Sequence, residues 1–150
     1  MTLPDSNTII RAYLADAVAN PALAALVGSR IYCPRLPENA TLPAIGFFTR
    51  GGTSTPYIPD LPTPSVQFDC WASNPIMARH VYKTLYDALQ GKQNIAVIIP
   101  ADILQDGIVI LPAGTYYILS AIEEVQGQDL VDIEIQNYFR TLCFFSIMVR

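Results

Sequence analysis

The sequence has little charge of either sign. Asp, Glu, Lys and Arg make up 15% of the 150 residues, against about 25% in a typical soluble domain, while hydrophobic residues make up 51%. The only lysines are Lys83 and Lys92, the arginines are scattered along the chain, and the formal net charge is −4. Tight electrostatic binding to nucleic acid requires a basic surface, so this composition argues against it.

Long hydrophobic runs are also missing. A membrane-spanning helix needs about 20 consecutive apolar residues, and the longest apolar runs here are Ile95–Ile99 and Leu142–Val149, the second interrupted by Ser146. The first residues lack the basic region of a secretory signal. We therefore expect no membrane segment. The apolar excess indicates surfaces that are buried against other protein chains, and a well-filled core in a monomer is the alternative interpretation.

Residues for catalysis or metal binding are scarce. His80 is the only histidine, and the sequence contains no GxSxG, HExxH or paired CxxC motif. The odd number and irregular spacing of Cys33, Cys70 and Cys143 indicate reduced thiols in a cytosolic protein. We therefore predict no enzymatic activity, no metal site and no cofactor. A small hydrolase or ligand-binding domain with His80 and Asp69 at a pocket is the weaker alternative, because Asp69 in a strand is better explained as a structural residue.

The length fits one domain over residues 1–150. Hydrophobic periodicity and capping residues predict helices over 5–19, Pro21–Val27 and 75–90, the last one beginning after Asn74-Pro75. Strands are expected at Ile31–Cys33, Ala44–Arg50, Val66–Ala72, Thr115–Gln126 and Arg140–Arg150, with shorter candidates at Ile95–Ile99 and Ile108–Leu111. The predicted fold is α+β: a mixed or antiparallel sheet, two main helices packed on it and a long C-terminal β-hairpin.

Proline and glycine are concentrated in one segment. Seven of the 12 prolines fall between Pro34 and Pro64, and Gly51–Pro64 has the composition of a long exposed loop. Since prolines limit the freedom of an unbound loop, they lower the cost of ordering it on docking. We predict a partner-docking loop, with Gly51, Gly52, Tyr57, Ile58, Asp60 and Leu61 as its contact residues.

Acidic residues gather before the last strand. Five carboxylates occur in twelve residues with no Lys or Arg between them, at Glu123, Glu124, Asp129, Asp132 and Glu134. One hypothesis places them at an interface with a neighbouring subunit or along the wall of a channel. The alternative is a solvated hairpin edge whose charges prevent unwanted strand pairing.

Three sequence segments resemble a known family. Asn20-Pro-Ala-Leu-Ala-Ala-Leu-Val-Gly-Ser-Arg-Ile-Tyr32 is followed by Leu42-Pro-Ala-Ile-Gly-Phe-Phe48, and then by Val66-Gln-Phe-Asp-Cys-Trp-Ala72 directly before a helix. In their order and pattern these segments are similar to the tail-terminator, or tail-completion, proteins of long-tailed bacteriophages. The resemblance covers roughly the first 90 residues.

The resemblance implies helices packed on a sheet and assembly into a ring, commonly of six copies, on the tail tube. Such a ring ends polymerisation of the tube and joins the tail to the head. It implies as partners further copies of the chain, the tail tube protein and the head–tail connector or neck protein, with DNA passing through the lumen unbound. The expected location is the virion, after assembly in the host bacterial cytoplasm. Another neck component, such as a head–tail adaptor, is the alternative within this class.

Overall fold

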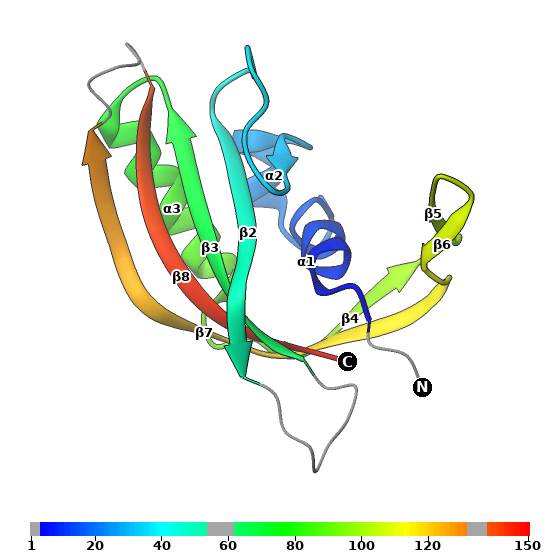
Figure 1. The fold of residues 1–150 in the computed structure, drawn as a ribbon. Helices are drawn as coiled ribbons and strands as arrows, with labels where there is room; N and C mark the ends of the chain where they lie inside the picture. The colour runs from blue at the N-terminus through cyan, green and yellow to red at the C-terminus, as the bar shows by residue number, and fades with distance from the viewer. Residues whose placement is uncertain (1–3, 54–61, 132–137) are drawn as a thin grey trace.

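The computed structural model describes residues 4–53, 62–131 and 138–150 (Figure 1). The elements in chain order are α1 (Ser6–Leu14), α2 (Pro21–Val27), β1 (Ile31–Tyr32), β2 (Ala44–Thr53), β3 (Thr63–Ala72), α3 (Pro75–Leu89), β4 (Gln93–Ile99), β5 (Ile103–Gln105), β6 (Ile108–Leu111), β7 (Gly114–Val131) and β8 (Phe139–Val149).

Six strands form one curled sheet in the order β1-β2-β3-β8-β7-β4. β1 runs parallel to β2, and every other neighbouring pair is antiparallel, so the sheet is mixed. The helices lie together on the concave side of the sheet (Figure 1). β5 and β6 pair only with each other, in a separate two-stranded sheet. The α+β prediction is therefore confirmed.

α1 ends earlier than the periodicity predicts. The helix stops at Leu14, and the carboxylate of Asp16 accepts a hydrogen bond of 3.0 Å from the backbone N–H of Val18. This local bond competes with continued helix formation. Val18, which lies within the expected helix but beyond the observed one, is 92% exposed. The expectation of one helix over 5–19 is wrong in its last five residues.

α3 follows the prediction closely. The side chain of Asn74 accepts a hydrogen bond of 2.8 Å from the backbone N–H of Met77, and Pro75 occupies the first helical turn. The cap satisfies one of the helix's unpaired N–H groups. The helix buries five residues against the sheet and the other helices: Ala78, Val81, Leu85, Ala88 and Leu89.

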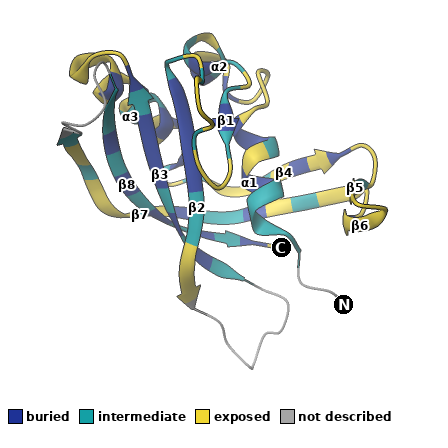
Figure 2. Ribbon diagram, turned by 45° about the horizontal axis from the view of Figure 1, so that its top comes forward, coloured by how far each residue is buried: buried dark blue, intermediate teal, exposed yellow. Residues whose placement is uncertain are grey.

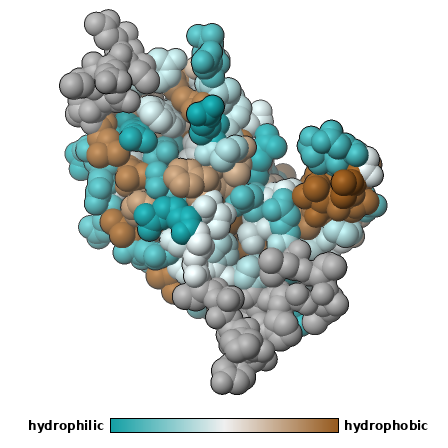
Figure 3. Space-filling view, viewed as in Figure 1, coloured by the Kyte–Doolittle hydropathy of each residue, from teal (hydrophilic) through white to brown (hydrophobic). Residues whose placement is uncertain are grey.

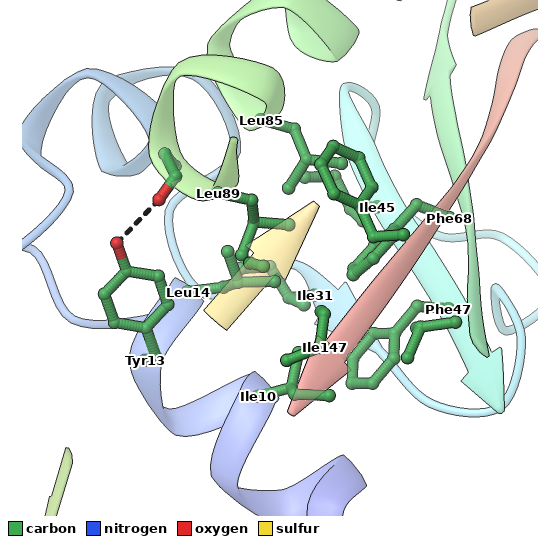
Figure 4. Close-up of a cluster of buried hydrophobic side chains, with 14 of the residues drawn as sticks. Ile10, Tyr13, Leu14, Ile31, Ile45, Phe47, Phe68, Leu85, Leu89 and Ile147 are labelled. Atoms are coloured by element: carbon green, nitrogen blue, oxygen red, sulfur yellow. Dashed lines mark hydrogen bonds between the residues drawn. The ribbon is translucent and has the colours of Figure 1, made fainter. Parts of the chain in front are cut away.

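The core lies between the helices and the concave face of the sheet (Figures 2 and 4). Phe68 stacks on Phe47 with ring centroids 5.5 Å apart and meets Phe145 edge-on at 5.7 Å, which joins three neighbouring strands. Tyr13 of α1 donates a hydrogen bond of 2.6 Å to the carbonyl oxygen of Ala88 in α3 (Figure 4). This buried bond fixes α1 against α3.

Two strands extend into segments that the sequence pattern assigned to loops. β2 continues to Thr53, and Gly52 pairs with Pro64 of β3. At Gly52 φ is +137° and an added Cβ would lie 2.3 Å from the carbonyl oxygen of Thr63, so only glycine fits. β7 continues past Gln126 to Val131 and pairs with β8, although the sequence pattern assigned Gly127–Asn137 to the connection of this hairpin; residues 132–137 lie outside the described residues.

Candidate assembly surfaces

The β5–β6 hairpin projects from the body of the protein (Figure 1); we call residues Ile103–Leu111 the arm. Its turn is the pair Asp106-Gly107, with φ of +52° and +79°, and Gln105 and Ile108 face each other across it. Both positive φ values match a two-residue hairpin turn, for which Asp-Gly is a preferred sequence. The sequence pattern predicted the strand Ile108–Leu111 but not its partner Ile103–Gln105, although Asp106-Gly107 was the signal for this turn.

The arm exposes apolar side chains. Its exposed members are Leu104 (57%), Ile108 (67%), Val109 (46%) and Ile110 (43%). They gather over β5 and β6 in Figure 3. Single exposed apolar residues are ordinary, but four on one short projecting hairpin, two on each face, are typical of a protein–protein contact.

The base of the arm is fixed to the body. The carboxylate of Asp102 accepts a hydrogen bond of 2.7 Å from the backbone N–H of Ala113, and the hydroxyl of Tyr116 donates one of 2.7 Å to the carbonyl oxygen of Pro112. Leu111 is buried in the main core. The arm is therefore held in a defined position instead of depending on its own two strands, which alone would be marginally stable.

β4 forms the sheet edge next to the arm. It pairs with β7 on one side, and no other strand of the described residues pairs with its outer edge. Ile98 is 72% exposed, and the strand Gln93–Ile99 contains neither proline nor charge. Edge strands usually carry proline or charged residues, which prevent association with other chains. Because β4 has neither, its edge is open to another chain.

A second apolar surface lies on the outer side of α3; we call it the helix patch. It surrounds a shallow depression of about 390 Å³ lined by Ile76, Met77, Arg79, His80 and Lys83. Ile76 is 81% exposed, in the first turn of the helix. Arg79 lies 3.6 Å from the carboxylate of Asp129, whereas Lys83 makes no ion pair within the described residues. The helix patch therefore combines apolar and cationic side chains.

The predicted docking loop is described only at its ends. Gly51 and Gly52 belong to β2 and not to a loop, which corrects their assignment, because the strand continues through a bulge to Thr53. Both glycines are exposed. The remaining members, Tyr57, Ile58, Asp60 and Leu61, lie outside the described residues, as does most of the proposed loop.

The acidic residues of β7 fall into different environments. Glu123 accepts a hydrogen bond of 2.6 Å from the hydroxyl of Tyr82, and Asp129 accepts one of 3.2 Å from the hydroxyl of Thr141 in addition to its contact with Arg79. Glu124 is exposed at a bulge between the pairs formed by Glu123 and Val125. Asp132 and Glu134 lie outside the described residues. Two of the five carboxylates thus hold β7 against α3 and β8.

His80 and Asp69 lie on opposite sides of the sheet. Phe68 and Cys70 point into the core beneath the helices, so Asp69 between them points to the convex face, whereas His80 lies on the outer side of α3. Asp69 is 3.7 Å from the guanidinium of Arg140. Burial raises its pKa above the ordinary value, and Arg140 and Gln67 oppose that shift. The two residues cannot share one pocket.

An open hollow of about 910 Å³ lies between α1, the segment 32–37 and the arm. Its wall includes Arg11, Tyr32 and the exposed Cys33, whereas Cys70 and Cys143 are buried. No cluster of three metal-binding side chains occurs among the residues that the structure describes. Among these residues, no helix has the length and apolar character needed to cross a membrane.

No known protein family matches the chain, and the search of curated proteins found no significant match.

Proposed function

We propose that the protein is a structural subunit of a bacteriophage tail, of the tail-terminator type, which closes the tail tube as a ring and joins it to the neck. The similarity of Asn20–Tyr32, Leu42–Phe48 and Val66–Ala72 to that family motivates the proposal. These segments form α2 with β1, the start of β2 and most of β3, and these three strands are neighbours in the main sheet.

The observation that carries the proposal is the arm. A subunit that works alone gains nothing from a fixed hairpin with four exposed apolar side chains, and such a surface favours aggregation unless another chain covers it. The unpaired edge of β4 lies beside it and offers a second contact. A ring subunit buries two side surfaces against its neighbours, which also accounts for the charged fraction of 15%.

The charge distribution supports a passive conduit. Seven of the 13 carboxylates and none of the nine Lys and Arg residues fall within residues 93–139, so this segment carries −7 and the remainder of the chain +3. A ring that presents part of this segment to its lumen would repel DNA instead of retaining it. Repulsion of this kind is screened beyond about 8–10 Å at physiological salt, so it acts only near the wall.

The alternatives differ in testable ways. A head–tail adaptor would use similar ring contacts but would bind the connector and leave tube growth unaffected. For a hydrolase based on His80 and Asp69, the placement of these residues on opposite sides of the sheet is unfavourable.

The test is the length of tail tubes assembled in vitro. Purified tail tube protein from the same phage is allowed to polymerise with increasing amounts of this protein, and tube lengths are measured by electron microscopy. We expect shorter tubes that carry the protein at one end only. Unchanged lengths together with binding to the connector would favour the adaptor alternative.

A further inference from the structure

We propose that neighbouring copies join by docking the arm of one copy against the helix patch of the next. The inference rests on the proposed function, because it specifies the contact that closes the ring. Each of the two surfaces binds another copy of this chain.

The two surfaces match in apolar character. The arm presents Ile108 and Ile110 on one face and Leu104 and Val109 on the other, because side chains alternate along its strands. The helix patch presents Ile76 and Met77 beside a depression of about 390 Å³. Ile76 at 81% and Ile108 at 67% exposure are among the most exposed large apolar side chains of the described residues. Their contact would remove both from water.

The two surfaces also match in charge. Asp106 lies at the tip of the arm and Asp102 at its base. The helix patch supplies Arg79, which contacts Asp129, and Lys83, which makes no ion pair within the described residues. Opposite charge at the rim of an apolar contact favours association in one orientation and opposes contact of like surfaces. Two arms or two helix patches would therefore be poor partners.

Their positions favour a ring. The arm and α3 lie at opposite ends of the molecule in both orientations (Figures 1 and 2). A contact between two different surfaces on opposite sides is head-to-tail, so each copy can accept one neighbour and dock on another. Such contacts produce a closed ring when the rotation between copies divides a full turn. The hollow lined by Arg11 and Tyr32 lies next to the base of the arm. If a neighbour's arm docked there, two copies would exchange arms and form a closed dimer instead of a ring.

The test uses two variants that each destroy one half of the contact. Ile108→Asp removes the apolar arm contact, and Ile76→Asp removes the apolar contact of the helix patch. Both positions are exposed in the isolated subunit, so the fold should persist, and melting temperature checks this. Val18→Asp is the matched control, because Val18 is 92% exposed and lies on neither surface.

Native mass spectrometry at concentrations where the wild type forms rings provides the measurement. We expect each variant alone to be monomeric, with the subunit dissociation constant raised roughly 30-fold, the effect of losing a central contact side chain. An equimolar mixture should give a 1:1 heterodimer and nothing larger, because only the arm of the Ile76→Asp chain and the helix patch of the Ile108→Asp chain remain intact. The Val18→Asp variant should form rings like the wild type.

A second pair of variants, each of which removes one charge, tests the charge complementarity of the two surfaces. Asp106→Asn removes the charge and keeps a residue that tolerates positive φ, and Lys83→Gln removes the charge and keeps a polar side chain. Each should weaken ring formation, and the salt dependence of assembly should fall in both.

The outcomes separate this inference from the proposed function. Rings formed by either Asp variant alone, or variants that remain monomeric when mixed, would overturn the arm–patch contact and leave the ring proposal in place. A wild-type protein that never forms rings, and leaves tube growth unchanged, would overturn the proposed function itself.

Discussion

Gly127→Ala should destabilise the protein, although glycine is usually a weak residue in a strand. An added Cβ at this position would lie 2.7 to 2.9 Å from three ring atoms of Tyr82. Carbon atoms pack best at about 3.5–4.0 Å, so the overlap approaches 1 Å. The ring of Tyr82 has little freedom to withdraw, because its hydroxyl is bonded to Glu123 at 2.6 Å. Gly127 thus provides the space in which α3 meets β7.

Overpacking of this kind costs about 1–3 kcal/mol of unfolding free energy. For a chain of 150 residues each kcal/mol lowers the melting temperature by about 2–4 °C, so we expect a loss of about 2–12 °C. Thermal and urea unfolding followed by circular dichroism measure this, with Gln128→Ala as control, since Gln128 is an exposed neighbour in the same strand. In the Tyr82→Ala background the same substitution should cost almost nothing. An equal cost in both backgrounds would refute the steric explanation.

Three further predictions concern single interactions. Asn74→Ala should lower the unfolding free energy by about 1 kcal/mol, because the hydrogen bond to the N–H of Met77 is lost, and an unchanged urea midpoint would contradict the capping role. Burial and the hydrogen bond to Glu123 raise the pKa of Tyr82 to about 12, so its proton contributes stability below pH 10 that is lost as the pH rises to about 12. Glu123→Gln should lower this pKa toward its ordinary value without reaching it, as measured by ultraviolet titration against a Tyr82→Phe reference; a pKa that stays at about 12 would rule out the contribution of Glu123. Because burial raises the pKa of Asp69, wild-type stability should fall relative to Asp69→Asn as the pH rises through that pKa, and a relative gain over this range would show that Arg140 outweighs burial.

Local patterns in the sequence predicted the elements whose stability is local. α3 has a side-chain cap, a proline in its first turn and a regular apolar stripe, and it begins where these signals place it. β8 alternates buried and half-buried residues between two neighbouring strands, and it too lies within one residue of its expected bounds. The α+β class follows from the succession of such elements.

The missed features depend on residues far apart in the sequence. Gly127 has the composition signal of a turn, but its role depends on Tyr82, 45 positions earlier. Gly52 is similarly required by the approach of Thr63. Glu123 and Asp129 belong to the acidic stretch of the sequence, whereas in the fold each contacts a side chain of α3. The spacing of residues along the chain does not predict these contacts.

The arm could have been found from the sequence. Asp106-Gly107 stands between short apolar segments, which is the pattern of a two-residue hairpin turn. The sequence does not predict that the arm projects from the body, because short apolar strands usually join the main sheet. That the arm instead forms a sheet of its own is a tertiary property, and it turns an ordinary apolar hairpin into a candidate contact surface.

The central claim is that copies of this chain assemble into a closed ring, and the symmetry of the assembly tests it most directly. Cryo-electron microscopy of the protein over a range of concentrations, sorted into class averages without imposed symmetry, provides the measurement. The account predicts closed rings, with six-fold symmetry expected from the resemblance to tail terminators. Two-fold dimers, open filaments, or monomers at every concentration and on the tube end would contradict it.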